Sequence, residues 1–355
     1  MLGQNADVRI WANRMLPPAP VQSWESSIDR CISLSEWFPT ERIPLPGNTL
    51  NSIQNVLFKC PPLCRDVSLA VDELKFRPSS LMVQDASIFN LLGISRVCVR
   101  KNLKASFYFH TNRHNKAVKL FAPYLRAHRR RFSFAAIHHS VADIASRALG
   151  LPVRMVPWPG DVTLRSQTAE GGSFEVAVLG RCRPEQVSGL NHIPSEKLIR
   201  LLTDGSMVLH LPSPFKESLF FKQLSPRARE RVIFRPSRLS DDAYRELLCS
   251  SHAVLLPYSA GDYQSKLSAI AEEATIAGIP FVIPRETLTW NTYEAEGICC
   301  GYNEEDPAGM SEAIGHIFQN YGGFRMRSES FAQKTRIDHS IHRFLRSMEG
   351  FPADE

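Results

Sequence analysis

Residues 252–284 read HAVLLPYSAGDYQSKLSAIAEEATIAGIPFVIP, and their pattern predicts a strand, a loop, a helix and a second strand. The strands are the short apolar runs Ala253–Leu256 and Phe281–Ile283. Between them, apolar residues recur at three- and four-residue steps from Ser265 onward, which indicates a helix that Gly278 ends. Strands that alternate with helices in this way are typical of a parallel α/β sheet.

The junction between the loop and the helix carries the chemistry. Lys266 is predicted in the first turn of the helix, where free N–H groups and partial positive charge suit a phosphate. Glu273 follows seven residues later, on the same predicted face. A nucleotide could be held at two points, its diphosphate by the cation and a ribose hydroxyl by the carboxylate. The residues alone also allow a solvated lysine and a surface glutamate.

A longer pattern surrounds these two residues, Tyr263-x-x-Lys266-x-Ser268-Ala269-x-x-x-Glu273-Ala274, followed by Gly278-x-Pro280. It resembles the donor-site segment of the glycosyltransferase group 1 family, and most of all its bacterial polysaccharide-type members. Those members carry Arg where this chain has Lys266, and Gly where it has Ala269; members with a Glu-x7-Glu pattern have their first Glu where this chain has Ser265. The Thr289-Trp290 pair is also similar to one in the same members.

The resemblance implies the GT-B fold, with two Rossmann-like α/β domains whose parallel sheets face a central cleft. It also implies roles for individual residues. Glu273 would bind the donor ribose, and the donor diphosphate and sugar would be lined by Tyr263, Gln264, Ser265, Lys266 and Ser268.

The length of 355 residues agrees with two domains, because single cores stop growing at about 250–300 residues. Hydrophobic residues make up 43% of the chain, and the net charge is +6, which favours anionic partners. No apolar run is long enough to span a bilayer, and the first residues lack the pattern of a signal peptide. We therefore expect a cytoplasmic protein.

The first domain is expected over residues 1–160. From residue 80 onward, strands alternate with helices, and ligands of such sheets bind beyond the carboxyl ends of the strands. His110 ends one predicted strand, and the resemblance implies that it faces the transferred sugar; an isolated histidine is more often structural. The strand that opens proteins of the resembled family is missing or diverged in this chain.

Residues 157–172 are rich in Pro, Gly, Ser and Thr and are predicted to link the domains. The donor domain is expected over residues 173–330, with residues 331–355 forming a terminal helix that packs back toward the first domain. The opening strand of the donor domain leads to Gly180-Arg181. The resemblance implies that Arg181 contacts the donor diphosphate. Arg183 would substitute for the lysine of a Glu-Lys-Gly sequence that the family usually carries next.

Basic residues gather between Lys101 and Arg131. They suggest one of two roles. They form a solvated helix face, or they make peripheral contact with the anionic inner surface of the cell membrane. A nucleic-acid partner is not expected, because aromatic residues do not interleave with the basic ones.

The resemblance therefore implies a retaining glycosyltransferase of the hexosyltransferase type. It would move a sugar from a nucleotide-diphosphate sugar to a saccharide or lipid-linked acceptor in polysaccharide biosynthesis. The chain has no Asp-x-Asp motif, so we expect a metal-independent site and no cofactor. One alternative is a non-catalytic nucleotide-sugar-binding or scaffold protein of the same fold, which the departures from the family pattern favour. Another is an epimerase or phosphorylase of this fold.

Overall fold

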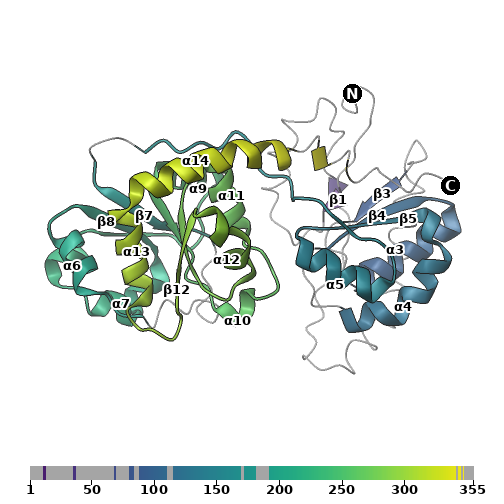
Figure 1. Ribbon diagram of the computed structural model, residues 1–355, viewed down its shortest axis with the longest axis horizontal. Coiled ribbons are helices and arrows are strands. Elements are labelled where there is room, and N and C mark those ends of the chain that lie inside the picture. Colours follow the sequence, from purple (N-terminus) through teal and green to yellow (C-terminus); the bar gives the residue numbers. More distant parts are fainter. Residues whose placement is uncertain are drawn as a thin grey trace. The chain divides into compact units, whose positions relative to one another are not determined.

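The computed structural model describes residues 80–83, 88–109, 115–168, 172–180 and 192–340, with short pieces at 11–12, 35–36, 68, 343–344 and 347 (Figure 1). The chain divides into two compact units. The first comprises Met1–Pro159 and Ile341–Glu355, and the second comprises Gly160–Ser340. Each unit has its own parallel sheet.

The first unit is built on a four-stranded sheet in the order β3-β4-β5-β6. Its strands are β3 (Ser80–Val83), β4 (Lys104–Phe109), β5 (Phe132–Ala136) and β6 (Arg154–Met155), joined by α3 (Ile88–Lys101), α4 (Asn115–Ala127), the 3-10 turn η1 (Arg129–Arg131) and α5 (His139–Leu149). Because neighbouring strands also follow one another in the chain, right-handed crossovers bring the helices to one face. Figure 1 shows α4 and α5 packed side by side along this sheet. A separate parallel pair joins β1 (Trp11–Ala12) to β2 (Ser35–Glu36).

The second unit holds a six-stranded parallel sheet in the order β12-β11-β10-β7-β8-β9. Its strands are β7 (Phe174–Val178), β8 (Met207–Pro212), β9 (Val232–Arg235), β10 (Ala253–Leu255), β11 (Phe281–Pro284) and β12 (Cys299–Tyr302). Counted within the unit, the order is that of the Rossmann doubly wound sheet, with a reversal between β7 and β10.

Helices cover both faces of the second sheet. One apolar core includes Leu198 and Ile314, and the other includes Leu248 and Ala274. Adjacent residues of β7 point to opposite faces, so Val176 packs into the first core and Ala177 into the second. The helices are α6 (Glu196–Thr203), α7 (Leu219–Lys222), α8 (Pro226–Arg229), α9 (Asp241–Ser250), α10 (Ala260–Tyr263), α11 (Ala269–Ala277), α12 (Leu288–Tyr293), α13 (Gly309–Gln319) and α14 (Tyr321–Asp338), with 3-10 turns η4 (Ser213–Glu217) and η5 (Glu294–Glu296).

The terminal helix was expected over residues 331–355, and beyond residue 340 most of that span lies outside the described residues. The described chain has the long helix α14, which ends at Asp338 and which the sequence pattern did not predict. It was missed because two glycines follow its first residue and it has few apolar residues. Its buried side chains are Phe324, Ser328, Ala332 and Thr335, and Ala332 packs against α11 of the second unit. Beyond it, Phe344 is buried in the first unit against Tyr108.

From Gly160 onward, the described part of the predicted linker lies along the second unit. The Ser166 N–H donates to the Ala277 carbonyl at 2.9 Å, and the Gln167 N–H donates to the Cys249 carbonyl at 2.7 Å. Leu164 is buried beside them. Among the helices of the described residues, we find none whose length and apolar character would let it cross a membrane.

Candidate functional site

The reversal of strand order in the second unit selects one place on the sheet. β7 and β10 are hydrogen-bonded neighbours there, with Val178 paired to Leu255 at their carboxyl ends. The chain leaves these two strands in opposite directions along the sheet, which opens a crevice where ligands of doubly wound sheets bind. The segments that leave the strands are Leu179–Gly180 and residues 256–268.

Gly180 brings the first segment close to the second. Its φ is +84°, in the left-handed region that glycine alone adopts without cost. A Cβ at this position would lie 2.3 Å from Cδ1 of Ile270, in the first turn of α11. A side chain at 180 would therefore require the Ile270 side chain of α11 to move.

The segment 256–268 presents stacked aromatic rings and a cation. The rings of Tyr258 and Tyr263 lie 4.0 Å apart and nearly parallel, at 6°. Nζ of Lys266 lies 4.2 Å from the centre of the Tyr263 ring, a cation–π distance. The ammonium group is thus fixed next to the start of α11.

The start of α11 is set by Ser268. Its Oγ accepts from the Ala271 N–H at 3.3 Å, and its own N–H donates to Oγ1 of Thr289 at 3.0 Å. Its Oγ also lies 3.1 Å from the Tyr258 hydroxyl. The helix therefore begins at Ala269.

The prediction that Lys266 lies in the first turn of the helix, two turns from Glu273 on one face, is wrong. Ser265 was taken as the beginning, but the side chain that caps the helix is that of Ser268, three residues later. Residues 260–263, expected as part of a loop, form the short helix α10. Oε2 of Glu304 accepts from the Ala260 N–H at 2.7 Å and so ties α10 to the segment after β12.

Glu273 is a half-buried carboxylate in the second turn of α11. Its Oε2 accepts a hydrogen bond from the hydroxyl of Tyr244 in α9. Burial raises the pKa of the Glu273 carboxyl, while the Tyr244 hydrogen bond and the charge of Arg245 act in the lowering direction. A carboxylate held in this way can accept hydrogen bonds from a ligand.

The preceding residue, Glu272, points elsewhere. It is buried, with 8% of its surface exposed, and accepts from the Tyr293 hydroxyl at 2.5 Å. Its Oε2 also lies 3.3 Å from Nε2 of His339, at the end of α14. Glu272 is thus enclosed by side chains of its own unit and serves packing.

The structure describes six of the nine predicted site residues, namely Tyr263, Gln264, Ser265, Lys266, Ser268 and Glu273. Tyr263 contacts Lys266, and Tyr258 contacts both Tyr263 and Ser268, whereas the carboxylate of Glu273 meets Tyr244. His110, Arg181 and Arg183 lie outside the described residues. Sequence reasoning missed Tyr244, Tyr258 and Glu304. Tyr244 lies 29 positions before its partner, so no local spacing could reveal the pair. Among the side chains that the structure describes, no group of three His, Cys, Asp or Glu is arranged to hold a metal ion.

In the first unit, the described histidine His138 follows the carboxyl end of β5. Its Nδ1 accepts from the Ser140 N–H at 3.2 Å and caps α5. Burial lowers the pKa of its imidazole, and neighbouring His139 lowers it further while Asp143 raises it. This histidine is thus a structural cap that needs a neutral ring.

No protein-family model and no curated protein sequence matches the chain. Solved structures do match in fold. HepE from Anabaena in complex with UDP and glucose is 11% identical, with 93% of this chain and 87% of that chain covered and a TM-score of 0.59. Sucrose-phosphate synthase from Thermosynechococcus elongatus is 12% identical, with 88% and 80% covered and a TM-score of 0.58.

The N-terminal domain of Candida albicans trehalose-6-phosphate phosphatase is also similar, at 11% identity and a TM-score of 0.60, with 99% of this chain and 92% of that chain covered. These likenesses, together with the parallel sheets of the two units, show that the chain has the GT-B fold with Rossmann-like α/β units.

Proposed function

We propose that the protein is a glycosyltransferase that uses a nucleotide-diphosphate sugar as its donor. The observation that carries the proposal is the arrangement at the strand reversal. Gly180 packs against the first turn of α11, Lys266 lies two residues before the cap Ser268, and Glu273 stands in the second turn. A cation beside a helix start suits a diphosphate, and a half-buried carboxylate suits the hydroxyls of a ribose.

In this proposal, the donor lies across the crevice of the second unit. Lys266, with Arg181 and Arg183, offsets the charge of the diphosphate, and Tyr263, Gln264, Ser265 and Ser268 line the diphosphate and sugar. Glu273 accepts from the ribose hydroxyls. The first unit binds the acceptor, a saccharide or lipid-linked saccharide, and His110 faces the transferred sugar.

The reaction needs no strong protein base. The bond between the sugar C1 and the diphosphate oxygen breaks, and C1 forms a new bond to the acceptor oxygen. The acceptor proton passes to the departing phosphate oxygen, on the face from which the nucleotide leaves, so the configuration at C1 is retained. Cationic groups already in place would stabilise the charge that develops on that oxygen without a metal ion.

The solved structures support the donor class. HepE is described in complex with UDP-glucose, and a similar enzyme from Burkholderia xenovorans is a UDP-forming trehalose-phosphate synthase. Transfer of a hexose from such a donor, in polysaccharide biosynthesis, is the form of the reaction that we propose for this chain.

A charge asymmetry in the first unit supports peripheral contact with an anionic membrane. No Asp or Glu occurs between Asp85 and Asp143, a stretch that contains eleven lysines and arginines. Several of these are exposed where α3 and α4 end and β4 and β5 begin: Arg100, Lys104, Arg126, Arg129 and Arg130.

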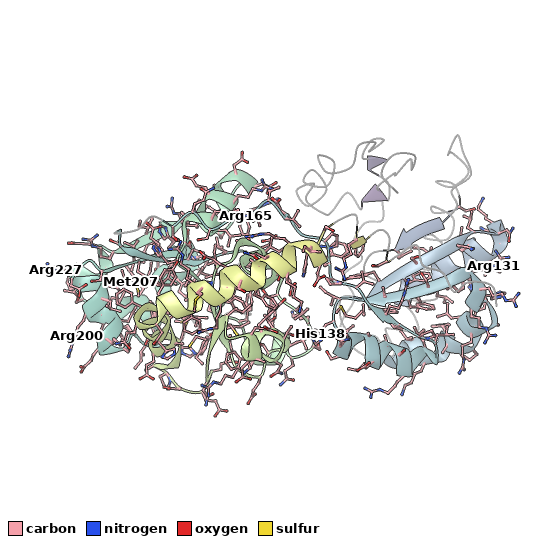
Figure 2. All side chains as sticks on the ribbon, turned by 45° about the horizontal axis from the view of Figure 1, so that its top comes forward. Arg131, His138, Arg165, Arg200, Met207 and Arg227 are labelled. Carbon is pink, nitrogen blue, oxygen red and sulfur yellow. The ribbon has the colours of Figure 1, made fainter. Side chains whose placement is uncertain are left out.

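Because the strands are parallel, these residues share the amino edge of the sheet, which we call the basic edge. Figure 2 shows Arg131 and His138 at opposite ends of the first unit, so the basic edge lies away from the carboxyl edge where substrates of such sheets bind. The aromatic side chains of α4 that the structure describes, Phe121 and Tyr124, are half-buried, and the Tyr124 ring packs on that of His128. An anionic lipid surface thus fits this edge better than nucleic acid.

A non-catalytic nucleotide-sugar-binding protein is the second candidate, and two observations favour it. The chain carries Ser265 where Glu-x7-Glu members have their first Glu, and the N-terminal domain of a protein named as a phosphatase is among the structures of similar fold.

Release of nucleotide diphosphate separates the two candidates. The protein is incubated with UDP-glucose and other common nucleotide sugars, with and without a saccharide mixture, and free nucleotide is measured against time. A transferase releases nucleotide, faster with acceptor, and Glu273→Ala reduces the rate. Binding without release would establish the non-catalytic candidate.

A further inference from the structure

The contact between Tyr244 and Glu273 joins two helices at the proposed nucleotide site. Tyr244 belongs to α9, the helix that precedes β10, and Glu273 belongs to α11, the helix that follows it. The Tyr244 ring packs against the apolar core beneath, and its hydroxyl donates to Oε2 of Glu273. Among the described residues, none donates to the other oxygen, Oε1.

We propose that Tyr244 is a positioning residue that aims the carboxylate of Glu273 at the ribose and keeps it ionised. The inference rests on the proposed function, in which Glu273 accepts from ribose hydroxyls. With Oε2 held by the phenol, Oε1 is left for the ligand and the rotation of the side chain is restricted. A phenol that donates to a carboxylate stabilises the ionised form, which is the form that accepts from two hydroxyls.

The surroundings of the pair leave Tyr244 as the group that orients Glu273. Arg245, also in α9, acts on the charge of Glu273, but its guanidinium is paired with Asp161. α14 packs on α11 through other residues, with Arg336 donating to the Ile276 carbonyl and His339 beside Glu272. On the side of Tyr244 itself, Tyr258 and Cys249 are the other titratable neighbours.

The adjacent glutamate supplies a matched control. Glu272 accepts from the Tyr293 hydroxyl much as Glu273 accepts from that of Tyr244, on the same helix. Glu272 is enclosed and Glu273 is half-buried. Removing either phenol oxygen deletes one buried tyrosine–carboxylate hydrogen bond. Only the loss at Tyr244 should change how the protein binds a ribose.

The test is the pH dependence of nucleotide binding in the full chain, with UDP, GDP and ADP as probes. Dissociation constants are measured by titration calorimetry between pH 4.5 and 8.5 for wild type, Tyr244→Phe, Tyr293→Phe and Glu273→Gln. In wild type, affinity falls at acid pH as Glu273 takes up a proton. Tyr244→Phe is expected to move this fall upward by about one pH unit, since a hydrogen bond to a charged group is lost.

Tyr293→Phe should keep the wild-type pH profile, even if its melting temperature drops. Glu273→Gln should bind weakly with no acid fall. The inference is overturned if Tyr244→Phe and wild type share one pH profile while Glu273→Gln is weakened, an outcome that leaves the proposed function intact. Wild-type affinity in Glu273→Gln, or no binding of any probe to wild type, would instead remove the assignment on which the inference rests.

Discussion

At the scale of single residues, Glu272 and Glu273 are neighbours in one helix whose carboxylates differ in burial and in hydrogen-bond partners. Glu272 is satisfied by Tyr293 and His339 inside the unit. Glu273 keeps part of its surface exposed, and burial raises the pKa of its carboxyl. A carboxylate held at some cost to the fold is the usual mark of a functional group.

This cost leads to a prediction on stability. The pKa of the Glu273 carboxyl is higher in the folded than in the unfolded chain. The protonated side chain therefore adds to the free energy of unfolding. This addition is complete below the unfolded pKa of about 4.3 and is lost as the pH rises through the folded pKa. Glu273→Gln removes the charge but keeps an acceptor for Tyr244. We expect the variant to melt at a higher temperature than wild type at pH 7–8, with the gap closing toward pH 4. A variant that melts below wild type at pH 8 would contradict this.

Spacing in the sequence was enough to propose Glu273 and Lys266 as site residues, because the resemblance depends on positions along one helix and its loop. The start of that helix was misplaced, since Ser265 and Ser268 are both good caps and the sequence does not say which one meets Thr289. Tyr244 could not be found, because its contact depends on how α9 packs against α11.

At the scale of elements, the packing of Gly180 on α11 gives the site its shape. The positive φ and the nearness of Ile270 both exclude a side chain. We expect Gly180→Ala to lower the free energy of unfolding by about 1–3 kcal/mol, measured with urea. Ile270→Val removes the Cδ1 atom that a new Cβ would meet, so the double variant should be less destabilised than the sum of the two singles.

Gly172→Ala is the matched control, because no atom lies within 4 Å of a Cβ at that position. It should change stability little. If Gly180→Ala and Ile270→Val changed the free energy of unfolding in a strictly additive way, residue 180 and the Ile270 side chain would not be in contact.

Strands and most helices could be predicted from the apolar pattern, since buried strands of a parallel sheet read as short apolar runs. α14 could not, because three of its four buried residues are the small side chains Ser328, Ala332 and Thr335. Tight packing of small side chains leaves almost no periodic signal.

At the scale of the whole molecule, the alternation of strands and helices predicted two parallel sheets, but not the strand order of either. Local patterns do not state on which side of the first strand each later strand is added. The reversal between β7 and β10, which locates the site, is therefore a finding of the structure.

The basic edge gives a prediction at this scale. Arg129→Ser with Arg130→Ser should weaken binding to vesicles of mixed phosphatidylcholine and phosphatidylglycerol by about 2 kcal/mol, or roughly 30-fold, at low salt. The control changes two exposed arginines of the second unit, Arg200 and Arg227, which Figure 2 also labels. Sedimentation with vesicles measures the effect. Equal losses in both variants would mean that only net charge matters, and binding to duplex DNA in place of vesicles would reassign the partner.

We propose that a nucleotide diphosphate binds at the carboxyl ends of β7 and β10, where the strand order reverses. Thermal shift tests this with UDP, GDP and ADP on wild type, Lys266→Ala and the control Lys222→Ala, whose lysine is exposed and paired with Glu217. At a hundred times its dissociation constant, a ligand adds about 2.7 kcal/mol of stability. We predict that one nucleotide raises the melting temperature of wild type and Lys222→Ala, and raises that of Lys266→Ala much less. An equal rise in melting temperature in all three proteins, or no rise with any nucleotide, would contradict the proposal that a nucleotide diphosphate binds beside Lys266.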